Sequence, residues 1–185
     1  STQAAPEDIS CSYPHPERHV DLCVLRHADL SELELPPTME TQFPDPTNIK
    51  RFELLISPDE GMYRGGKFRF SISANDNYPH DPPKVKCLQR VSLWTRGANI
   101  CVQVYHPNLD LDGNVCLNIL REEWNPILNL NSVVVGLLFL FLDPNADDPL
   151  NKGSIAQPLT PAEAAEDLRR DKTVFSSNVQ RTMAG

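Results

Sequence analysis

Alternating apolar and polar positions predict a small sheet in the first half of the chain. The alternation runs over Arg51–Ser57 and Lys67–Ser73 and predicts two strands, and the segment that contains Val85 and Cys87 predicts a third. A Pro-Asp-Glu-Gly turn and a proline-rich loop separate these segments. Strands that are polar on one face and apolar on the other are typical of an antiparallel meander that packs on one side.

The second half of the chain has a helical pattern. Asn131 or Ser132 is predicted to cap a helix that runs to about Leu142; its residues are apolar nearly all round, so we expect it in the core against the sheet. Thr160–Glu163 combines an N-cap, a proline and a capping-box glutamate, which predicts a further helix. A short helix is predicted over Asp29–Leu35, before a Pro-Pro pair. Strands followed by helices indicate an α+β domain.

Composition limits the domain count and the classes of partner. A chain of 185 residues with 40% hydrophobic residues suits one domain with a proper core. The net charge of -8 argues against a nucleic-acid partner. The most apolar run, Val133–Leu142, is shorter than the roughly 20 residues that span a bilayer, so no membrane partner is expected. Residues 1–28 hold scattered prolines and histidines without a periodic pattern, and we expect them to be poorly ordered.

The five cysteines are widely spaced and include no C-x-x-C pair, so no metal site is expected. Their odd number, with no apolar signal segment at the start of the sequence, predicts a reducing compartment, the cytoplasm or the nucleus.

The candidate chemistry lies in Val104–Trp124, which contains a His-Pro-Asn turn, an Asp-Gly-Asn turn and Cys116. A thiol on a turn-rich loop near an asparagine amide indicates covalent acyl chemistry. The alternative is that Cys116 is a small buried hydrophobic residue, as most intracellular cysteines are. Spacing alone does not decide between them.

Several motifs in a fixed order point to a family. They are PDEG, YPHDPPKV, HPN followed by GNVCLNIL, WNP, and DPNADDPL. In this order they resemble the ubiquitin-conjugating enzymes, over residues 29–185 apart from two interruptions. The stretches CLNILREEW, DPLNK and NVQRTM are most similar to the member that conjugates the Rub/NEDD-type modifier to cullins. The resemblance implies the UBC fold: a four-stranded antiparallel meander with an N-terminal helix, a buried central helix and C-terminal helices.

The resemblance also implies an activity. Cys116 would accept the modifier as a thioester from a heterodimeric activating enzyme and pass it to a substrate lysine. The implied partners are the Rub/NEDD-type modifier, the activating enzyme, and a RING-type ligase with its cullin substrate. The reaction needs no metal or organic cofactor in this chain, because ATP is consumed by the activating enzyme.

Roles for four more residues follow from the resemblance. Asn108 would either stabilise the developing oxyanion or brace its loop, two alternatives that the sequence leaves open. His106 would brace the loop by hydrogen bonding rather than shuttle a proton. Asp148 would orient or deprotonate the incoming lysine, whereas Asp147 would be solvated surface.

His80 and Asp81, together with Pro144 and Asn145, match the two loops that meet a RING-type ligase in this family. The alternative is that both loops are simply solvated.

The chain departs from the family at residues 1–28, 91–103 and 153–162, and the first of these resembles neither the family's first helix nor its activating-enzyme peptide. We hypothesise that these segments are translated introns or read-through of the gene model, since the Val-Ser and Gln that bound residues 91–103 are compatible with splice-site codons. The alternative for residues 91–103 is a genuine hairpin that turns at Arg96–Asn99. Either way the extra residues precede His106, and a shift of about 1 Å at a catalytic group can cost 10²-fold in rate.

Three other functions therefore stay open. The chain could be a conjugating enzyme of another subfamily, or a UBC-fold binding module that the interruptions have inactivated. A cysteine protease is the weakest alternative, because no separate histidine with an Asn or Asp partner stands out.

Overall fold

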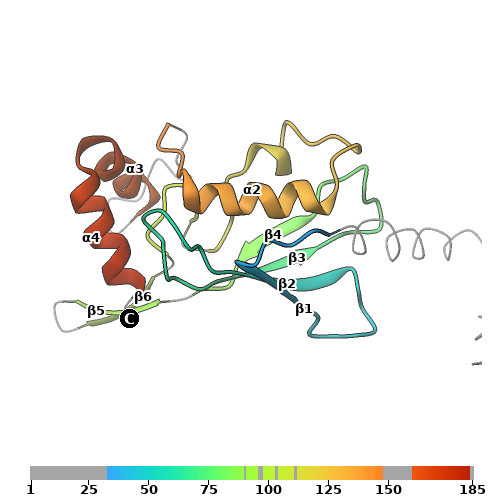
Figure 1. The fold of residues 1–185 in the computed structure, drawn as a ribbon, viewed down its shortest axis with the longest axis horizontal. Helices are drawn as coiled ribbons and strands as arrows, with labels where there is room; N and C mark the ends of the chain where they lie inside the picture. The colour runs from blue at the N-terminus through green and yellow to red at the C-terminus, as the bar shows by residue number, and fades with distance from the viewer. Residues whose placement is uncertain are drawn as a thin grey trace, which may run out of the picture.

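The structure is a computed structural model that describes residues 33–89, 91–95, 98–102, 104–110, 112–147 and 160–183. An antiparallel sheet runs in the order β1 (Met39–Gln42), β2 (Arg51–Ile56), β3 (Phe68–Ser73) and β4 (Lys84–Cys87). Helix α2 (Leu130–Leu142) lies across this sheet, and α3 (Pro161–Arg170) and α4 (Lys172–Met183) gather beyond one end (Figure 1). The expected α+β architecture and four-stranded meander are confirmed.

The alternation in the sequence sets the inner face of the sheet. In the β2–β3 register Phe52 lies opposite Ile72, Leu54 opposite Phe70 and Ile56 opposite Phe68, and all six are buried. Strand β1 was not predicted, because only its first residue, Met39, is buried and no apolar alternation marks it.

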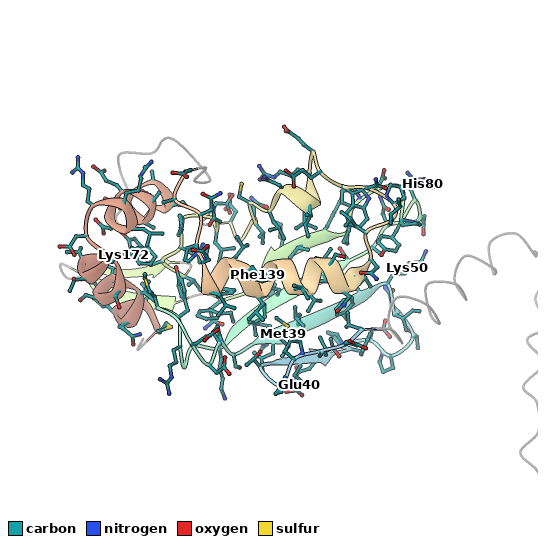
Figure 2. All side chains as sticks on the ribbon, turned by 45° about the horizontal axis from the view of Figure 1, so that its top comes forward. Met39, Glu40, Lys50, His80, Phe139 and Lys172 are labelled. Carbon is teal, nitrogen blue, oxygen red and sulfur yellow. The ribbon has the colours of Figure 1, made fainter. Side chains whose placement is uncertain are left out.

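Helix α2 starts earlier than predicted. Asn129 is the N-cap, and its Oδ1 accepts from the backbone N–H of Ser132 at 3.0 Å. The prediction of Asn131 or Ser132 as the cap is therefore wrong, since both lie in the first turn, while the predicted end at Leu142 is confirmed. As expected, the helix lies in the core against the sheet, although Phe139 is 60% exposed (Figure 2).

The C-terminal helices begin at the predicted capping box. The Thr160 hydroxyl oxygen accepts from the backbone N–H of Glu163 at 3.3 Å, and the Glu163 carboxylate accepts from the Thr160 N–H at 2.9 Å. Helix α3 ends before Asp171, whose Oδ1 accepts from the N–H of Thr173 at 2.8 Å, so α3 and α4 are separate helices.

The predicted N-terminal helix falls mostly outside the described residues, as do residues 1–28. Its described part is not helical: Leu33 and Leu35 lie in irregular chain and pack against the core.

The first interruption contains two strands, β5 (Val91–Thr95) and β6 (Ala98–Val102), which form a separate antiparallel sheet. Val91 pairs with Val102 and Thr95 with Ala98. This pairing matches the hairpin alternative, although Ala98 and Asn99 of the predicted Arg96–Asn99 turn lie in β6. It does not test the intron hypothesis. Residues 153–159 of the second interruption lie outside the described residues, and residues 160–162 form the cap and the start of α3.

Among the described helices, none has both the length and the apolar character needed to cross a membrane.

Candidate functional site

A tight turn orients the segment that carries the candidate cysteine. The Asp110 carboxylate oxygen Oδ1 accepts from the backbone N–H groups of Asp112 at 2.9 Å and Asn114 at 2.7 Å. Gly113 has a φ of +82°, a conformation that side-chain-bearing residues rarely adopt. A Cβ at Gly113 would stand 2.3 Å from the carbonyl oxygen of Cys87, so the turn approaches β4 more closely than any side chain allows.

This turn brings Cys116 back alongside Asn108. Its backbone N–H donates to the Asn108 carbonyl oxygen at 2.8 Å, next to a bridge between Leu109 and Val115. The His-Pro-Asn turn and Cys116 are therefore neighbours, as the sequence interpretation requires.

Asn108 joins its loop to the segment that follows α2. Its side-chain Nδ2 donates to the Asn145 carbonyl oxygen at 2.9 Å, and its Oδ1 accepts from the Asn145 backbone N–H at 3.0 Å. The side chain thus binds backbone through both ends of its amide. These bonds fit the loop brace, one of the two alternative roles of Asn108, and the oxyanion role stays a prediction.

His106 is buried beneath the same loop. Its Nδ1 accepts from the Asn108 backbone N–H at 2.9 Å, so Nε2 carries the proton and donates to the Leu140 carbonyl oxygen at 2.8 Å. Burial lowers the pKa of His106 to about 4, which leaves the ring neutral near pH 7. Both ring nitrogens are bonded to backbone, and neither is placed to shuttle a proton.

Two tyrosines anchor the chain just before His106. The Tyr63 hydroxyl donates to the Tyr105 carbonyl oxygen at 2.7 Å, and the Tyr105 hydroxyl donates to Asp167 Oδ2 at 2.7 Å. The Tyr63 ring also stacks on His106 with centroids 5.1 Å apart. Sequence reasoning missed these contacts, although an aromatic residue directly beside the His-Pro-Asn turn was a usable signal.

Cys116 is 7% exposed and lines a small pocket of about 240 Å³. The other residues that line this pocket are Asn108, Leu117, Asn118, Ile119, Glu123, Leu140 and Asn145. Cys87, another free cysteine, is 3% exposed and packs in the core. Burial raises the pKa of Cys87 to about 11, because a thiolate there would lose its hydration, so Cys87 is a poor nucleophile.

The four residues predicted to meet a ligase do not form one surface. Asn145 and Pro144 follow the C-terminal end of α2 beside Asn108, whereas His80 lies near the opposite end of the sheet (Figure 2). Asp81 belongs to the His80 loop, which is tied to Trp124 by a hydrogen bond from Nε1 to the Pro79 carbonyl oxygen at 2.9 Å. The two loops are therefore separate in the structure, and a ligase contact at either one stays a prediction.

Asp148 lies outside the described residues. Its neighbour Asp147 is exposed, as expected, and its backbone N–H donates to Asn145 Oδ1 at 2.9 Å. Within the described chain there is no group of three or more side chains able to hold a metal ion.

Comparisons with known proteins agree with this arrangement. The family model described as "Ubiquitin-conjugating enzyme" matches residues 26–183. The chain is 54% identical to the NEDD8-conjugating enzyme ubc12 of Schizosaccharomyces pombe, over 85% of this chain and 76% of that protein. It is 53% identical to the Nedd8-conjugating enzyme UbcE2M of Drosophila melanogaster, over 85% of this chain and 74% of that protein.

A solved structure of Ubc12 from S. cerevisiae superposes with a TM-score of 0.69 at 38% identity, covering 91% of this chain and 80% of that one. The predicted UBC fold is thereby confirmed. The chain belongs to the ubiquitin-conjugating enzyme family.

Proposed function

We propose that this chain carries NEDD8 as a thioester on Cys116 and transfers it to a lysine of a substrate protein. Relatives at 53% and 54% identity bear the name NEDD8-conjugating enzyme. The structural observation that supports the proposal is the position of the Cys116 thiol, in a pocket beside the Asn108 loop and its brace to Asn145.

The proposed chemistry is two acyl transfers without a change of oxidation state. The Cys116 thiolate attacks the thioester carbonyl on the activating enzyme, a new C–S bond forms, the old C–S bond breaks, and the activating enzyme's thiolate leaves. A neutral lysine amine then attacks the Cys116 thioester, so that a C–N bond forms, the C–S bond breaks and the thiolate leaves. The proton lost by the lysine nitrogen goes to Asp148 or to water. ATP is consumed before the first transfer, so no cofactor is needed here.

In this scheme Asn108 and His106 hold the loop that borders the thiol. Their hydrogen bonds to Asn145 and Leu140 fix the loop to both ends of one segment, the last turn of α2 and the residues after it. Fixed donors and a fixed thiol lower the reorganisation needed at the moment of transfer.

A charging assay tests the proposal. The chain is incubated with the NEDD8-activating enzyme, NEDD8 and ATP, and the product is run with and without a thiol reductant. A reductant-sensitive adduct should form with the wild-type chain and with Cys87→Ala, and Cys116→Ala should give none. An adduct with ubiquitin alone would assign the chain to another conjugating subfamily. No adduct with either modifier would leave only the binding-module alternative.

The role of Asp148 needs a second measurement on the same charged enzyme. Discharge to free lysine is followed after the activating enzyme has been stopped. Asp148→Asn should slow discharge, most strongly at low pH where fewer lysine amines are neutral, while charging continues. The matched control is Asp147→Asn, which removes the same charge one residue earlier. Equal effects of the two substitutions would contradict a specific role for Asp148.

We further propose a RING-type ligase and its cullin as the remaining partners. Asn145 already braces Asn108, which leaves the His80 loop as the better candidate for a ligase contact. Ligase-stimulated discharge should fall in His80→Ala, with Pro144→Ala as the comparison. If only Pro144→Ala lowers the stimulated rate, the ligase contact lies at the C-terminal end of α2 instead.

The need for a reduced thiol also bears on the cellular compartment. A cysteine nucleophile must stay reduced, so we propose that the chain works in the cytoplasm and nucleus, where thiols are kept reduced. Microscopy of the tagged protein checks this, and exclusive localisation in an oxidising compartment would contradict it.

A further inference from the structure

Helices α3 and α4 are linked by one carboxylate to the active-site loop, the stretch that contains His106 and Asn108. Asp167, on α3, accepts from the Tyr105 hydroxyl through Oδ2 at 2.7 Å, and Tyr105 directly precedes His106. The two helices lie together beyond one end of the sheet (Figure 1). The proposed function uses no residue of either helix, so this contact connects it to a part of the fold with no role so far.

The position of the Asp167 carboxylate is set from both helices. In the sequence Asp167 lies between Ala164 and Leu168, which are both buried in the core, so their burial fixes the rotation of α3 about its axis. From α4, the side-chain Nδ2 of Asn178 donates to the same Oδ2 at 3.0 Å. Within the described chain Asp167 forms no ion pair, so these two neutral donors hold the carboxylate.

Tyr105 passes this position on because its side chain and its backbone are both held. Its carbonyl oxygen accepts from the Tyr63 hydroxyl at 2.7 Å, and its ring is 1% exposed, with its centroid 5.7 Å from that of Phe175. Burial, and then the bond to Asp167, raise the pKa of Tyr105 well above its usual range, so its hydroxyl stays protonated and remains the donor. The chain therefore enters His106 from a fixed peptide plane.

We propose that Asp167 is a positioning residue for the transfer of the modifier: acting through Tyr105, it holds the active-site loop in place beside Cys116. The inference rests on the proposed function and adds a remote residue to the same reaction. The Asn108 carbonyl oxygen accepts from the Cys116 N–H at 2.8 Å, so a displacement of the loop reaches the nucleophile. A displacement of about 1 Å can lower a rate about 10²-fold, whereas a contact that only stabilises the fold leaves the rate of the folded enzyme unchanged.

The experiment measures transfer by charged enzyme that is folded. Discharge of the thioester to free lysine is followed in single turnover after the activating enzyme has been stopped, and circular dichroism shows that each variant is folded at the assay temperature. Asp167→Ala should lower the rate constant about tenfold, less than the full effect of a 1 Å shift, because the other contacts of the loop remain.

Two further variants show whether the effect passes through Tyr105. Tyr105→Phe removes only the hydroxyl and should slow discharge about as much as Asp167→Ala. The double variant should be no slower than either single variant, since both changes break the same bond. Asp167→Asn should recover most of the rate, because the amide oxygen can still accept from the Tyr105 hydroxyl and from Asn178.

The matched control is Asp171→Ala. Asp171 lies between α3 and α4, and its Oδ1 accepts from the backbone N–H groups of Thr173 at 2.8 Å and Val174 at 3.4 Å. The substitution removes the same side chain and the same charge from the same pair of helices, and it should lower the unfolding temperature because these bonds are lost. Discharge by the folded control should match that of the wild type.

Each result has a definite meaning. If Asp167→Ala discharges at the wild-type rate, or Tyr105→Phe does so where the alanine variant does not fold, the positioning role is wrong and the proposed function stands. If Asp171→Ala is slowed as much as Asp167→Ala, or if the two effects multiply in the double variant, the helices act by another route and the positioning role is again wrong. If the wild type forms no thioester, the proposed function itself has failed at the first step.

Discussion

Gly113 offers the sharpest test of the turn that positions Cys116. The perturbation is Gly113→Ala, which adds one methyl group at a backbone φ of +82°. The chain contains a matched control in Gly65→Ala: Gly65 has a φ of +83°, but a Cβ there would meet no atom within 4 Å. The two substitutions therefore share the backbone cost and differ in the collision with strand β4.

The difference in free energy of unfolding follows from the geometry. A left-handed conformation costs an alanine about 1–2 kcal/mol, and the smaller entropy of the unfolded alanine chain is common to both variants. At Gly113 the new Cβ would stand 2.3 Å from the Cys87 carbonyl oxygen, so the turn must move. Overpacking costs about 1–3 kcal/mol, and weakening the 2.8 Å bond from the Cys87 N–H to the Gly113 carbonyl oxygen adds about 1 kcal/mol. We expect Gly113→Ala to cost about 2–4 kcal/mol more than Gly65→Ala.

Urea unfolding followed by circular dichroism measures this difference, and the charging assay measures its consequence at Cys116. A displacement of about 1 Å can lower a rate 10²-fold, so charging of Gly113→Ala should fall by at least about tenfold. Gly65→Ala should charge normally. Equal unfolding midpoints for the two variants would show that the turn yields without strain, and the argument for a rigid Cys116 segment would fail.

Three further predictions concern the loop and helix α2. Burial lowers the folded-state pKa of His106 to about 4, below its ordinary value, so as the pH falls the unfolded chain takes up the proton first. The free energy of unfolding should therefore fall by about 3 kcal/mol between roughly pH 6.5 and 4. Urea midpoints measured over this range should fall less in His106→Gln. Asn108→Ala should lower the unfolding temperature if Asn108 braces Asn145, whereas an oxyanion role alone would leave stability intact and slow transfer by about 10²–10³-fold. Asn129→Ala should cost about 1 kcal/mol in urea unfolding because it removes the N-cap, and Asn131→Ala should cost less, since its buried Oδ1 makes no hydrogen bond with a described residue.

Local signals predicted the elements of this fold well. The alternation of Phe68, Phe70 and Ile72 marks β3, and the Thr160–Glu163 capping box marks the start of α3. Both signals act over a few neighbouring residues and need no knowledge of the rest of the chain. Their success explains why α+β architecture could be predicted from periodicity alone.

The errors arise where several residues compete for one local role. Asn129, Asn131 and Ser132 can all cap a helix, and the choice of Asn129 depends on where the loop reaches the sheet. Apolar residues recur at helical spacing on both sides of Asp171, as at Leu168, Phe175 and Val179. The sequence pattern therefore does not reveal that α3 ends there. Burial of one helix face is likewise set by what covers it, which is why the largely apolar α2 leaves Phe139 exposed.

The site depends on contacts between residues that are distant in sequence. Cys116 and the His-Pro-Asn turn could be singled out as motifs, but the partner of Asn108 lies 37 residues away at Asn145. Tyr105 likewise reaches Asp167, 62 residues along the chain. Such pairs are fixed by the path of α2 and α3, and no periodic pattern predicts them.

These distant contacts explain how the active-site loop keeps its place after an interruption at residues 91–103. The loop is held from three sides: Tyr63 bonds the Tyr105 carbonyl oxygen, Leu140 accepts from His106, and Asn145 bonds both ends of the Asn108 amide. None of these partners belongs to the interruption. Because the entropy of closing a loop rises only slowly with its length, an excursion with its own paired strands adds little cost, and the anchors do not depend on it.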